Sequence, residues 1–256
     1  MDLGLRGQNV LVTGGSSGIG LETARLLLAE GARVTICGRN PERLAAAEAN
    51  LNSADVLAVA ADVCSSDSAA GLVAAAEQHG DGLDGVAAVA GWGWHGSLLE
   101  LDPSDVVAEV SDKLLGLLNV VGPAAPALTA AHGSVVGITA PTAARPSVAM
   151  AAISAGRAAL DNALSSLALE LAPDVRVNAV GVGITDTPRQ VERHEVSGST
   201  ETYQEWLITQ ARGRSIPLER AATAGEVAAA ICWLLSPLSS YTTGSVLDVT
   251  GGLRSR

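Results

Sequence analysis

The chain has 256 residues and a formal net charge of -11. Its length suits one α/β domain, spanning residues 1–256, that buries its core without cross-links. An acidic chain with no concentrated basic patch would be repelled by a polyanion, so nucleic acid and anionic membrane surfaces are excluded as partners.

The ends and the cysteines give further expectations. Residues 1–6 lack the charged and then apolar pattern of a signal sequence, and no apolar run approaches the ~18 residues of a membrane span. We therefore expect a cytoplasmic protein. Cys37, Cys64 and Cys232 lie far apart in apolar segments, and none has a partner at metal-ligand spacing. They are interpreted as small buried hydrophobic residues, and no metal site is expected.

Apolar, β-rich segments alternate along the chain with longer helical stretches rich in alanine and leucine. Seven strands are predicted, at residues 10–13, 33–37, 56–60, 86–90, 134–138, 176–180 and 245–249. Between them, Asn40 can cap a helix that starts at Pro41, and Gly31 can end a helix that begins near Gly18. The pattern predicts an α/β fold of the Rossmann type, a doubly wound, seven-stranded parallel sheet flanked by helices.

Residues 187–217 interrupt the alternation of strands and helices. This segment is charged and contains Gly198 and Gly213. We interpret it as an excursion over the carboxyl edge of the sheet, where open α/β sheets bind ligands. It is therefore the expected substrate loop.

A glycine-rich segment follows the first predicted strand and opens the first predicted helix. Glycines let the backbone approach a pyrophosphate closely, and the helix amino terminus offers free N–H groups and a favourable dipole. Taken alone, such a segment can also be a plain strand-to-helix turn. The candidate contacts are Thr13, Gly14, Ser16, Ser17, Gly18, Ile19 and Gly20.

The TGxxxGxG spacing of this segment resembles the cofactor motif of the short-chain dehydrogenase/reductase family. The likeness continues with Asp62-Val63, similar to an adenine-contacting pair, with the RVNAV strand at 176–180, with Thr187-Pro188 in a cofactor loop, and with the closing GxxLxVxGG at 244–252. The resemblance implies a dinucleotide cofactor. It adds these candidate cofactor contacts: Asp62, Val63, Gly91, Arg157, Gly183 and Thr187.

The end of the second predicted strand bears on the choice of cofactor. The chain has Gly38-Arg39 there rather than an acidic residue. An acid would accept hydrogen bonds from the ribose hydroxyls of NAD, whereas a guanidinium can pair with the 2′-phosphate of NADP. NADP is therefore predicted in preference to NAD. An exposed arginine that merely follows a strand is the alternative.

The catalytic positions depart from the family. In this family an asparagine, a serine, a tyrosine and a lysine polarise a carbonyl and deliver its proton. Counting along the motifs places these positions on Lys113, Ala140, Ile153 and Arg157. A positioned general acid is worth about 10²–10⁴ in rate, and neither Ala140 nor Ile153 can supply it. The resemblance therefore implies a degenerate active site that is not an ordinary carbonyl reductase.

Two functional hypotheses remain open. Lys113, the only lysine, could join Arg157 in placing two cations near the nicotinamide. Such a pair suits an anionic ligand or a developing enolate, as in hydride transfer to an activated double bond. The alternative for Lys113 is neutralisation by Asp112 or another acid. The second hypothesis is a non-catalytic cofactor-binding or regulatory protein, or an inactive subunit that partners a catalytic homologue.

Other residues in the segments around the expected pocket suggest a small-molecule substrate. Aromatic side chains could stack there on an apolar or aromatic ligand, with simple packing as the alternative; they are Trp92, Trp94, Tyr203 and Trp206. His95 and His194 are candidate proton donors, with ordinary surface positions as the alternative. The helices matching residues 103–120 and 151–171 imply, by resemblance, a homodimer or homotetramer.

Overall fold

The computed structural model describes residues 2–91 and 93–253. Seven parallel strands form one sheet in the order β3-β2-β1-β4-β5-β6-β9. The predicted doubly wound parallel sheet is confirmed. Its strands are β1 Asn9–Thr13, β2 Arg33–Gly38, β3 Val56–Ala60, β4 Gly85–Ala88, β5 Ser134–Thr139, β6 Arg176–Val182 and β9 Val246–Val249.

One strand ends earlier than its apolar sequence predicts. Strand β4 stops at Ala88, two residues before the predicted end. The hydroxyl of Thr13 accepts hydrogen bonds from the N–H groups of Val89 and Ala90, both at 3.1 Å. These two residues therefore leave the ladder and turn across the end of β1.

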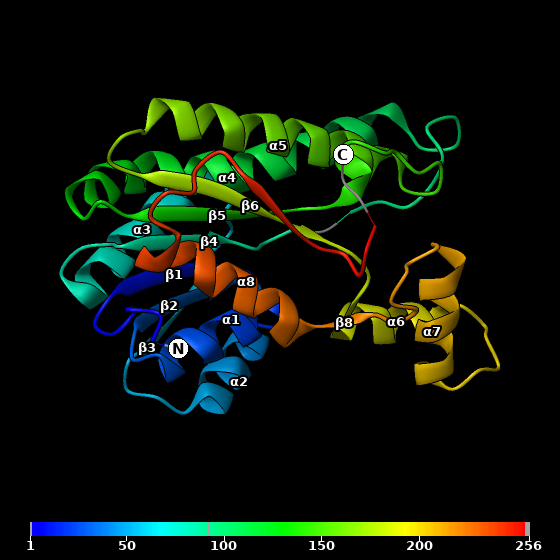
Figure 1. Cartoon of the computed structure of the whole chain (residues 1–256), viewed down its shortest axis with the longest axis horizontal. Coiled ribbons are helices and arrows are strands. Elements are labelled where there is room, and N and C mark those ends of the chain that lie inside the picture. The colour runs from blue at the N-terminus through cyan, green and yellow to red at the C-terminus, as the bar shows by residue number, and fades with distance from the viewer. Residues whose placement is uncertain (1, 92, 254–256) are drawn as a thin grey trace.

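Helices cover both faces of the sheet (Figure 1). On one face lie α3 Ser66–Gly80, α4 Pro103–Ala130 and α5 Ala151–Glu170, and on the other α1 Gly18–Ala29, α2 Pro41–Leu51 and α8 Ala224–Leu235. Because both faces are covered, every residue of β1 and β5 is buried, and the strands form continuous apolar runs. Two single-turn 3₁₀ helices, Pro141–Ala143 and Pro237–Ser239, complete these layers.

The predicted helix boundaries on the first half of the sheet are confirmed. The side chain of Asn40 accepts a hydrogen bond from the backbone N–H of Arg43 at 2.8 Å and caps α2. Helix α1 begins at Gly18, and Gly31 follows its last turn with φ +82°, a left-handed conformation that glycine adopts readily.

Residues 185–223 form a small projection beside the carboxyl edge of the sheet (Figure 1). Two short strands, β7 Thr185–Asp186 and β8 Ala222–Thr223, pair at its base, and α6 Pro188–Val196 and α7 Tyr203–Gly213 lie between them. The projection has its own apolar cluster, which consists of Ile184, Trp206, Leu207, Ala211 and Ile216.

Helix α4 differs from one expectation. In the described part of the chain it is the one helix long and apolar enough, by length and composition alone, to cross a membrane. Its buried residues, among them Leu117, Val121 and Leu128, pack against the sheet and the neighbouring helices. One side of α4 thus belongs to the core, and 33% of its most apolar stretch is buried.

Candidate active site

The cradle between β1 and α1 has no room for side chains at two of its glycines. A Cβ added to Gly14 would come within 2.9 Å of the Ala90 Cα, and one added to Gly20 would clash with the carbonyl oxygen of Gly14. Gly14 and Gly18 also have positive φ, +69° and +55°. Ser17 caps α1 without a side-chain hydrogen bond, so the first N–H groups of this helix stay available to an anion. The cradle therefore fits a pyrophosphate.

The remaining predicted cofactor contacts lie along the same edge. Arg39 follows β2 and is exposed, and a Cβ on the preceding Gly38 would lie 2.9 Å from the Ser16 Oγ, so Arg39 adjoins the cradle. Asp62 follows β3, and its carboxylate accepts the N–H of Cys64 at 3.0 Å. Thr187 opens α6, with its side chain 3.4 Å from a Cβ placed on Gly18. The other predicted contacts are Ile19, in the first turn of α1 and packed against the core, Val63, buried after β3, Gly91, after β4, and Gly183, after β6.

Three of the four positions of the tetrad belong to α4 and α5, and the fourth follows β5. A Cβ on Gly156 would lie 3.2 Å from both the Glu109 carbonyl oxygen and the Lys113 Cγ, so the two helices approach closely at this glycine. Lys113 belongs to α4, while Ile153 and Arg157 stand one turn apart on α5. Ala140 follows β5 and precedes a single 3₁₀ turn.

Lys113 forms a buried ion pair with Glu109, one turn earlier on α4. Its Nζ lies 2.7 Å from the Glu109 Oε1, with side chains only 5% and 1% exposed. The other carboxylate oxygen of Glu109 accepts the N–H of Trp94 at 3.2 Å. A carboxylate other than Asp112 therefore neutralises Lys113, and it also anchors the loop after β4. Burial, reinforced by the charge of Arg157, lowers the pKa of Lys113.

The side chain of Arg157 is hydrogen-bonded to the end of β5. Its guanidinium donates a hydrogen bond to the carbonyl oxygen of Ile138, two residues before Ala140. Burial, with the charge of Arg189, lowers the pKa of Arg157 to about 10, and Glu109 and Asp161 act in the opposite direction. Arg157 stays charged near neutral pH and contributes positive charge to the site.

Comparisons with known proteins identify the family of the chain. The family described as Enoyl-(Acyl carrier protein) reductase matches residues 14–254. The chain belongs to the short-chain dehydrogenase/reductase family. A 3-oxoacyl-[acyl-carrier-protein] reductase of Chlamydia pneumoniae is 31% identical over 99% of both chains, and an uncharacterized oxidoreductase of Mycobacterium bovis is 31% identical over 97% of both.

Solved structures of this family include one with an unusual site. A short chain oxidoreductase from Pseudomonas aeruginosa, described as containing an atypical catalytic center, is 35% identical, with a TM-score of 0.94 over 100% of both chains. Its NADPH-bound form matches with a TM-score of 0.92 over 98% of both. L-sorbose reductase from Gluconobacter frateurii, complexed with NADPH and L-sorbose, is 26% identical, with a TM-score of 0.92 over 99% of this chain and 98% of its own.

The aromatic residues expected to border the pocket of this dehydrogenase/reductase divide into separate groups. Trp206 is 5% exposed in the apolar cluster of the projection, and the hydroxyl of Tyr203 donates to Asp186 at 2.5 Å. His194 packs against both rings, with centroids 5.8 and 5.5 Å away. These three side chains hold α6 and α7 together, which favours the packing alternative for them. Trp94 is half-buried beside Glu109, and Trp92 lies outside the described residues.

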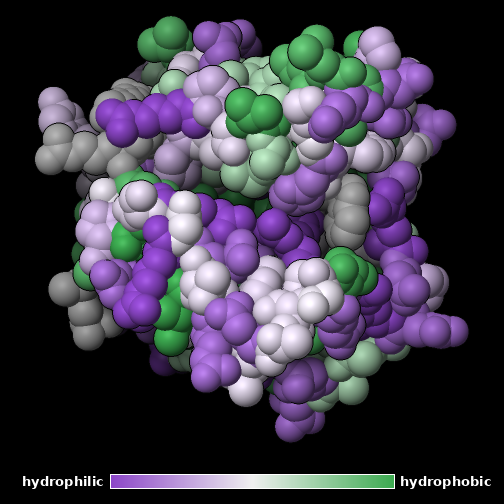
Figure 2. Space-filling model, turned by 90° about the vertical axis from the view of Figure 1, so that its right-hand side faces the viewer, coloured by the Kyte–Doolittle hydropathy of each residue, from purple (hydrophilic) through white to green (hydrophobic). Residues whose placement is uncertain are grey.

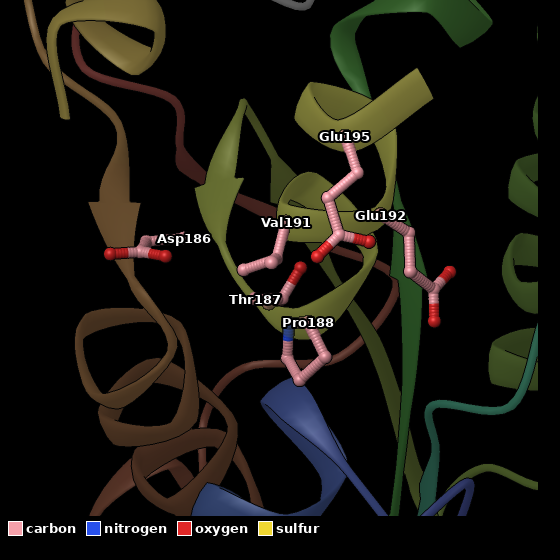
Figure 3. Close-up of a pocket in the computed structure, with 6 residues that line it drawn as sticks. All are labelled: Asp186, Thr187, Pro188, Val191, Glu192 and Glu195. Carbon is pink, nitrogen blue, oxygen red and sulfur yellow. The ribbon is translucent and has the colours of Figure 1, made fainter. Parts of the chain in front are cut away.

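A groove of about 540 Å³ runs along one side of α6 (Figure 3). Pro188 lies over the amino terminus of α1, with its Cδ 3.9 Å from a Cβ placed on Gly18. The groove is acidic and therefore does not suit phosphate groups. It is lined by Asp186, Thr187, Pro188, Val191, Glu192 and Glu195.

The sequence analysis did not identify two charged residues of the site, Glu109 and Arg189. Glu109 and Lys113 stand in an ExxxK spacing that signals a pair on one helix face, but the burial of Glu109 depends on where α5 crosses. Arg189 follows the Thr187-Pro188 motif directly and donates to the Gly91 carbonyl oxygen at 2.5 Å. The contact joins the projection to the loop after β4.

Proposed function

We propose that the chain is an NADP(H)-dependent oxidoreductase that reduces a carbon–carbon double bond activated by a neighbouring carbonyl group. The observation that carries this proposal is the buried Glu109–Lys113 pair, which faces Ile153 and Arg157 across the α4–α5 crossing. The pair puts an acid–base couple and a surplus of positive charge where the family places its polar tetrad.

NADP is the proposed cofactor because the cradle and Arg39 together suit it. The backbone from Gly14 to Gly20 would hold the pyrophosphate, and the exposed Arg39 guanidinium would pair with the 2′-phosphate. The NADPH complexes of the Pseudomonas and Gluconobacter relatives support this choice. Bound NADPH supplies the hydride.

Lys113 is the residue that can hold and release a proton at this site. An ammonium whose pKa is lowered by burial and by a neighbouring cation donates a proton more readily at neutral pH than an ordinary lysine does. Glu109, at 2.7 Å, stabilises the charged ammonium of Lys113 before the proton is transferred. Lys113 is therefore proposed to stabilise the developing enolate and to return its proton to the carbon chain.

Ile153 and Ala140 set the limits of this chemistry. Ile153 packs against the loop after β4, where a Cβ on Gly93 would lie 2.6 Å from the Ile153 Cγ1. Neither side chain can donate a proton to a carbonyl oxygen held between them. Simple ketones are therefore proposed to be poor substrates, whereas an activated alkene needs a cation at its carbonyl oxygen and takes its proton on carbon, from Lys113.

A non-catalytic cofactor-binding or regulatory role, including that of an inactive subunit beside a catalytic homologue, is the second candidate. Its support is the same ion pair, because Glu109 neutralises the one lysine of the chain. Exposed leucines on α4 and α5 support assembly of either kind, as dimer or tetramer: Leu115, Leu118 and Leu169 are 40%, 45% and 83% exposed. A small-molecule substrate and a cytoplasmic location belong to the same proposal.

The first experiment separates binding from turnover. NADPH and NADH are titrated against the protein by fluorescence, and oxidation of NADPH is then followed with a panel of ketones and enones. We expect tighter binding of NADPH, turnover with enones and little turnover with ketones. NADPH binding without oxidation by any enone would favour the non-catalytic candidate, and fast ketone reduction would contradict the reading of Ile153.

Two substitutions at one position then test the proton donor. Lys113→Arg keeps the charge of the site but replaces a group that can lose its proton with one that cannot. If Lys113 donates the proton, enone turnover falls by about 10²–10⁴ in both Lys113→Arg and Lys113→Met, with NADPH binding unchanged. Full activity in Lys113→Arg would limit Lys113 to a purely electrostatic role.

A restoration experiment completes the test. Changing Ala140→Ser, Ile153→Tyr and Arg157→Lys together reinstates the family's acid machinery at the matching positions. Carbonyl reduction should then appear in a protein that still binds NADPH. Continued inactivity with tight NADPH binding would show that the shape of the pocket, rather than the missing acid, prevents ketone reduction.

A further inference from the structure

Helix α6 carries opposite charges on two of its faces. Successive residues of an α-helix are rotated by roughly 100°, so Arg189 and Arg193, four positions apart, share one face. Pro188, Glu192 and Glu195 share another face, which lines the acidic groove. Gln190 is buried beneath the helix. The groove and the two arginines therefore lie on different sides of α6.

The basic face of α6, which carries Arg189 and Arg193, contacts the loop beside the tetrad positions. Arg189 donates to the Gly91 carbonyl oxygen at 2.5 Å, and a Cβ on the same Gly91 would lie 3.7 Å from the Lys113 Nζ. The charge of Arg189 also acts on both Lys113 and Arg157. Gly91 thus lies between Arg189 and the buried ion pair.

Arg214 adds a third cation to Arg189 and Arg193. Arg214, at the end of α7, is half-buried and donates to the carbonyl and side-chain oxygens of Gln210 at 2.8 and 2.9 Å. Arg193 is half-buried and forms no ion pair within residues 2–91 and 93–253. Burial, followed by the charges of Arg193, Arg189 and Arg214, lowers the pKa of His95 in the facing loop.

The loops opposite these arginines expose large apolar side chains. Leu98, Leu99 and Val148 are 56%, 99% and 77% exposed, and the two loops that carry them are joined by a bridge between Gly96 and Met150. Figure 2 shows this end of the molecule, with a recess between a part rich in apolar residues and a more polar part. The entrance to the site therefore has an apolar side and a cationic side.

We propose that Arg189, Arg193 and Arg214 bind an oxyanion, a carboxylate or a phosphate, on the substrate while its apolar portion lies against the facing loops. Guanidinium groups match oxyanions in planar, charge-assisted pairs. Two acids act on this face without matching its three charges: Glu192 acts on Arg189, and Glu109 is paired with Lys113, whereas Arg193 has no ion pair in the described residues. That the bound oxyanion belongs to a substrate rests on the proposed function. The binding of the oxyanion itself does not depend on turnover.

The test compares two ligands that differ by one charge. trans-3-Benzoylacrylate and its methyl ester are titrated by calorimetry into the protein saturated with NADP⁺, and phenyl phosphate is titrated in a parallel arm. The acid should bind about tenfold more tightly than the ester, and Arg193→Gln should remove that difference without changing ester binding. The stronger of the carboxylate and phosphate arms identifies the oxyanion.

The matched control is Arg212→Gln. Arg212 is another arginine of the projection, on α7, but it is exposed and paired with Glu219 at 2.9 Å. Its loss should therefore leave the acid–ester difference unchanged. A second readout uses the unmodified protein: the acid should raise the pKa of the His95 ring in an NMR titration, because a bound anion offsets the arginines, and the ester should not.

The outcomes distinguish this inference from the proposed function. Equal binding of acid and ester, no binding of either, or an acid–ester difference that survives in Arg193→Gln would overturn the oxyanion site. Acid binding that depends on Arg193, in a protein that reduces no enone, would support the site and count against the proposed reaction.

Discussion

The buried Glu109–Lys113 pair is open to a double-mutant cycle. The single changes are Glu109→Gln and Lys113→Met, and the third variant combines them. The two charged atoms are 2.7 Å apart in side chains that are 1% and 5% exposed, so each single change leaves a buried charge without its ion-pair partner. Removing one partner of a buried pair costs about 3–5 kcal/mol of stability.

Added independently, the two losses would amount to roughly 6–10 kcal/mol, comparable with the whole stability of an ordinary domain. The double variant buries no unpaired charge at these positions, and replacing a buried pair by apolar or neutral groups is often close to neutral in free energy. We therefore expect the double variant to be at least as stable as either single variant, with a coupling free energy of about 3 kcal/mol or more.

The two single variants should differ in their pH dependence. In Glu109→Gln the ammonium of Lys113 faces Arg157 without its carboxylate, so the folded pKa of Lys113 falls further below the ordinary value of a lysine. The unfolded chain then binds more protons than the folded chain between the two pKa values. The free energy of unfolding of Glu109→Gln should therefore rise with pH through that window, an increase that Lys113→Met cannot show.

Urea unfolding followed by tryptophan fluorescence measures all four proteins at one protein concentration. Equal slopes of free energy against urea are needed before the values are compared. Effects that add within about 0.5 kcal/mol would refute the coupling, and with it the claim that Glu109 holds Lys113 in its charged form.

Three further predictions concern the cradle and the thiols. Arg39→Asp should weaken NADPH binding by about tenfold or more and leave NADH binding intact in fluorescence titrations; an unchanged ratio would remove Arg39 from the 2′-phosphate site. Gly20→Ala should lower the melting temperature and weaken NADPH binding because its Cβ clashes with a cradle carbonyl, whereas Gly71→Ala, with nothing within 4 Å, should be neutral or stabilising; equal effects would contradict this account. Burial raises the pKa of Cys37 to about 11 and of Cys232 to about 12, so at pH 8 a thiol reagent should label neither rapidly in the folded protein, and rapid labelling of both would show that these segments open.

The sequence predicted the sheet well because local patterns and burial agree there. Covered parallel strands are continuous apolar runs, and all seven lay at the predicted places. The end of β4 was predicted two residues too late because the residues remain apolar while Thr13 captures their N–H groups. A side-chain contact 76 residues away in the chain cannot be seen in a local pattern.

The site was predicted in part, and the missing part depends on tertiary contacts. Lys113 and Arg157 were candidates from their positions, but Glu109 had no signal beyond an ordinary spacing of opposite charges on a helix. The same spacing usually describes a solvated pair, and here both side chains are buried. The aromatic residues illustrate the opposite error. Trp206 and Tyr203 lie in the segment expected to border the pocket, but their side chains pack within the projection.

Gly156 is the residue that joins these observations. With no Cβ at this position, α4 and α5 approach until the Glu109 backbone and the Lys113 side chain meet α5, so the pair on α4 faces Ile153 and Arg157. The four altered tetrad positions thus belong to a contiguous group with one anion and two cations. Three arginines of the projection add to that excess, which gathers five of the 16 Lys and Arg residues at one edge of a chain with net charge -11. Such a local field in an acidic protein favours an anionic ligand at this edge and repels it from the remaining surface.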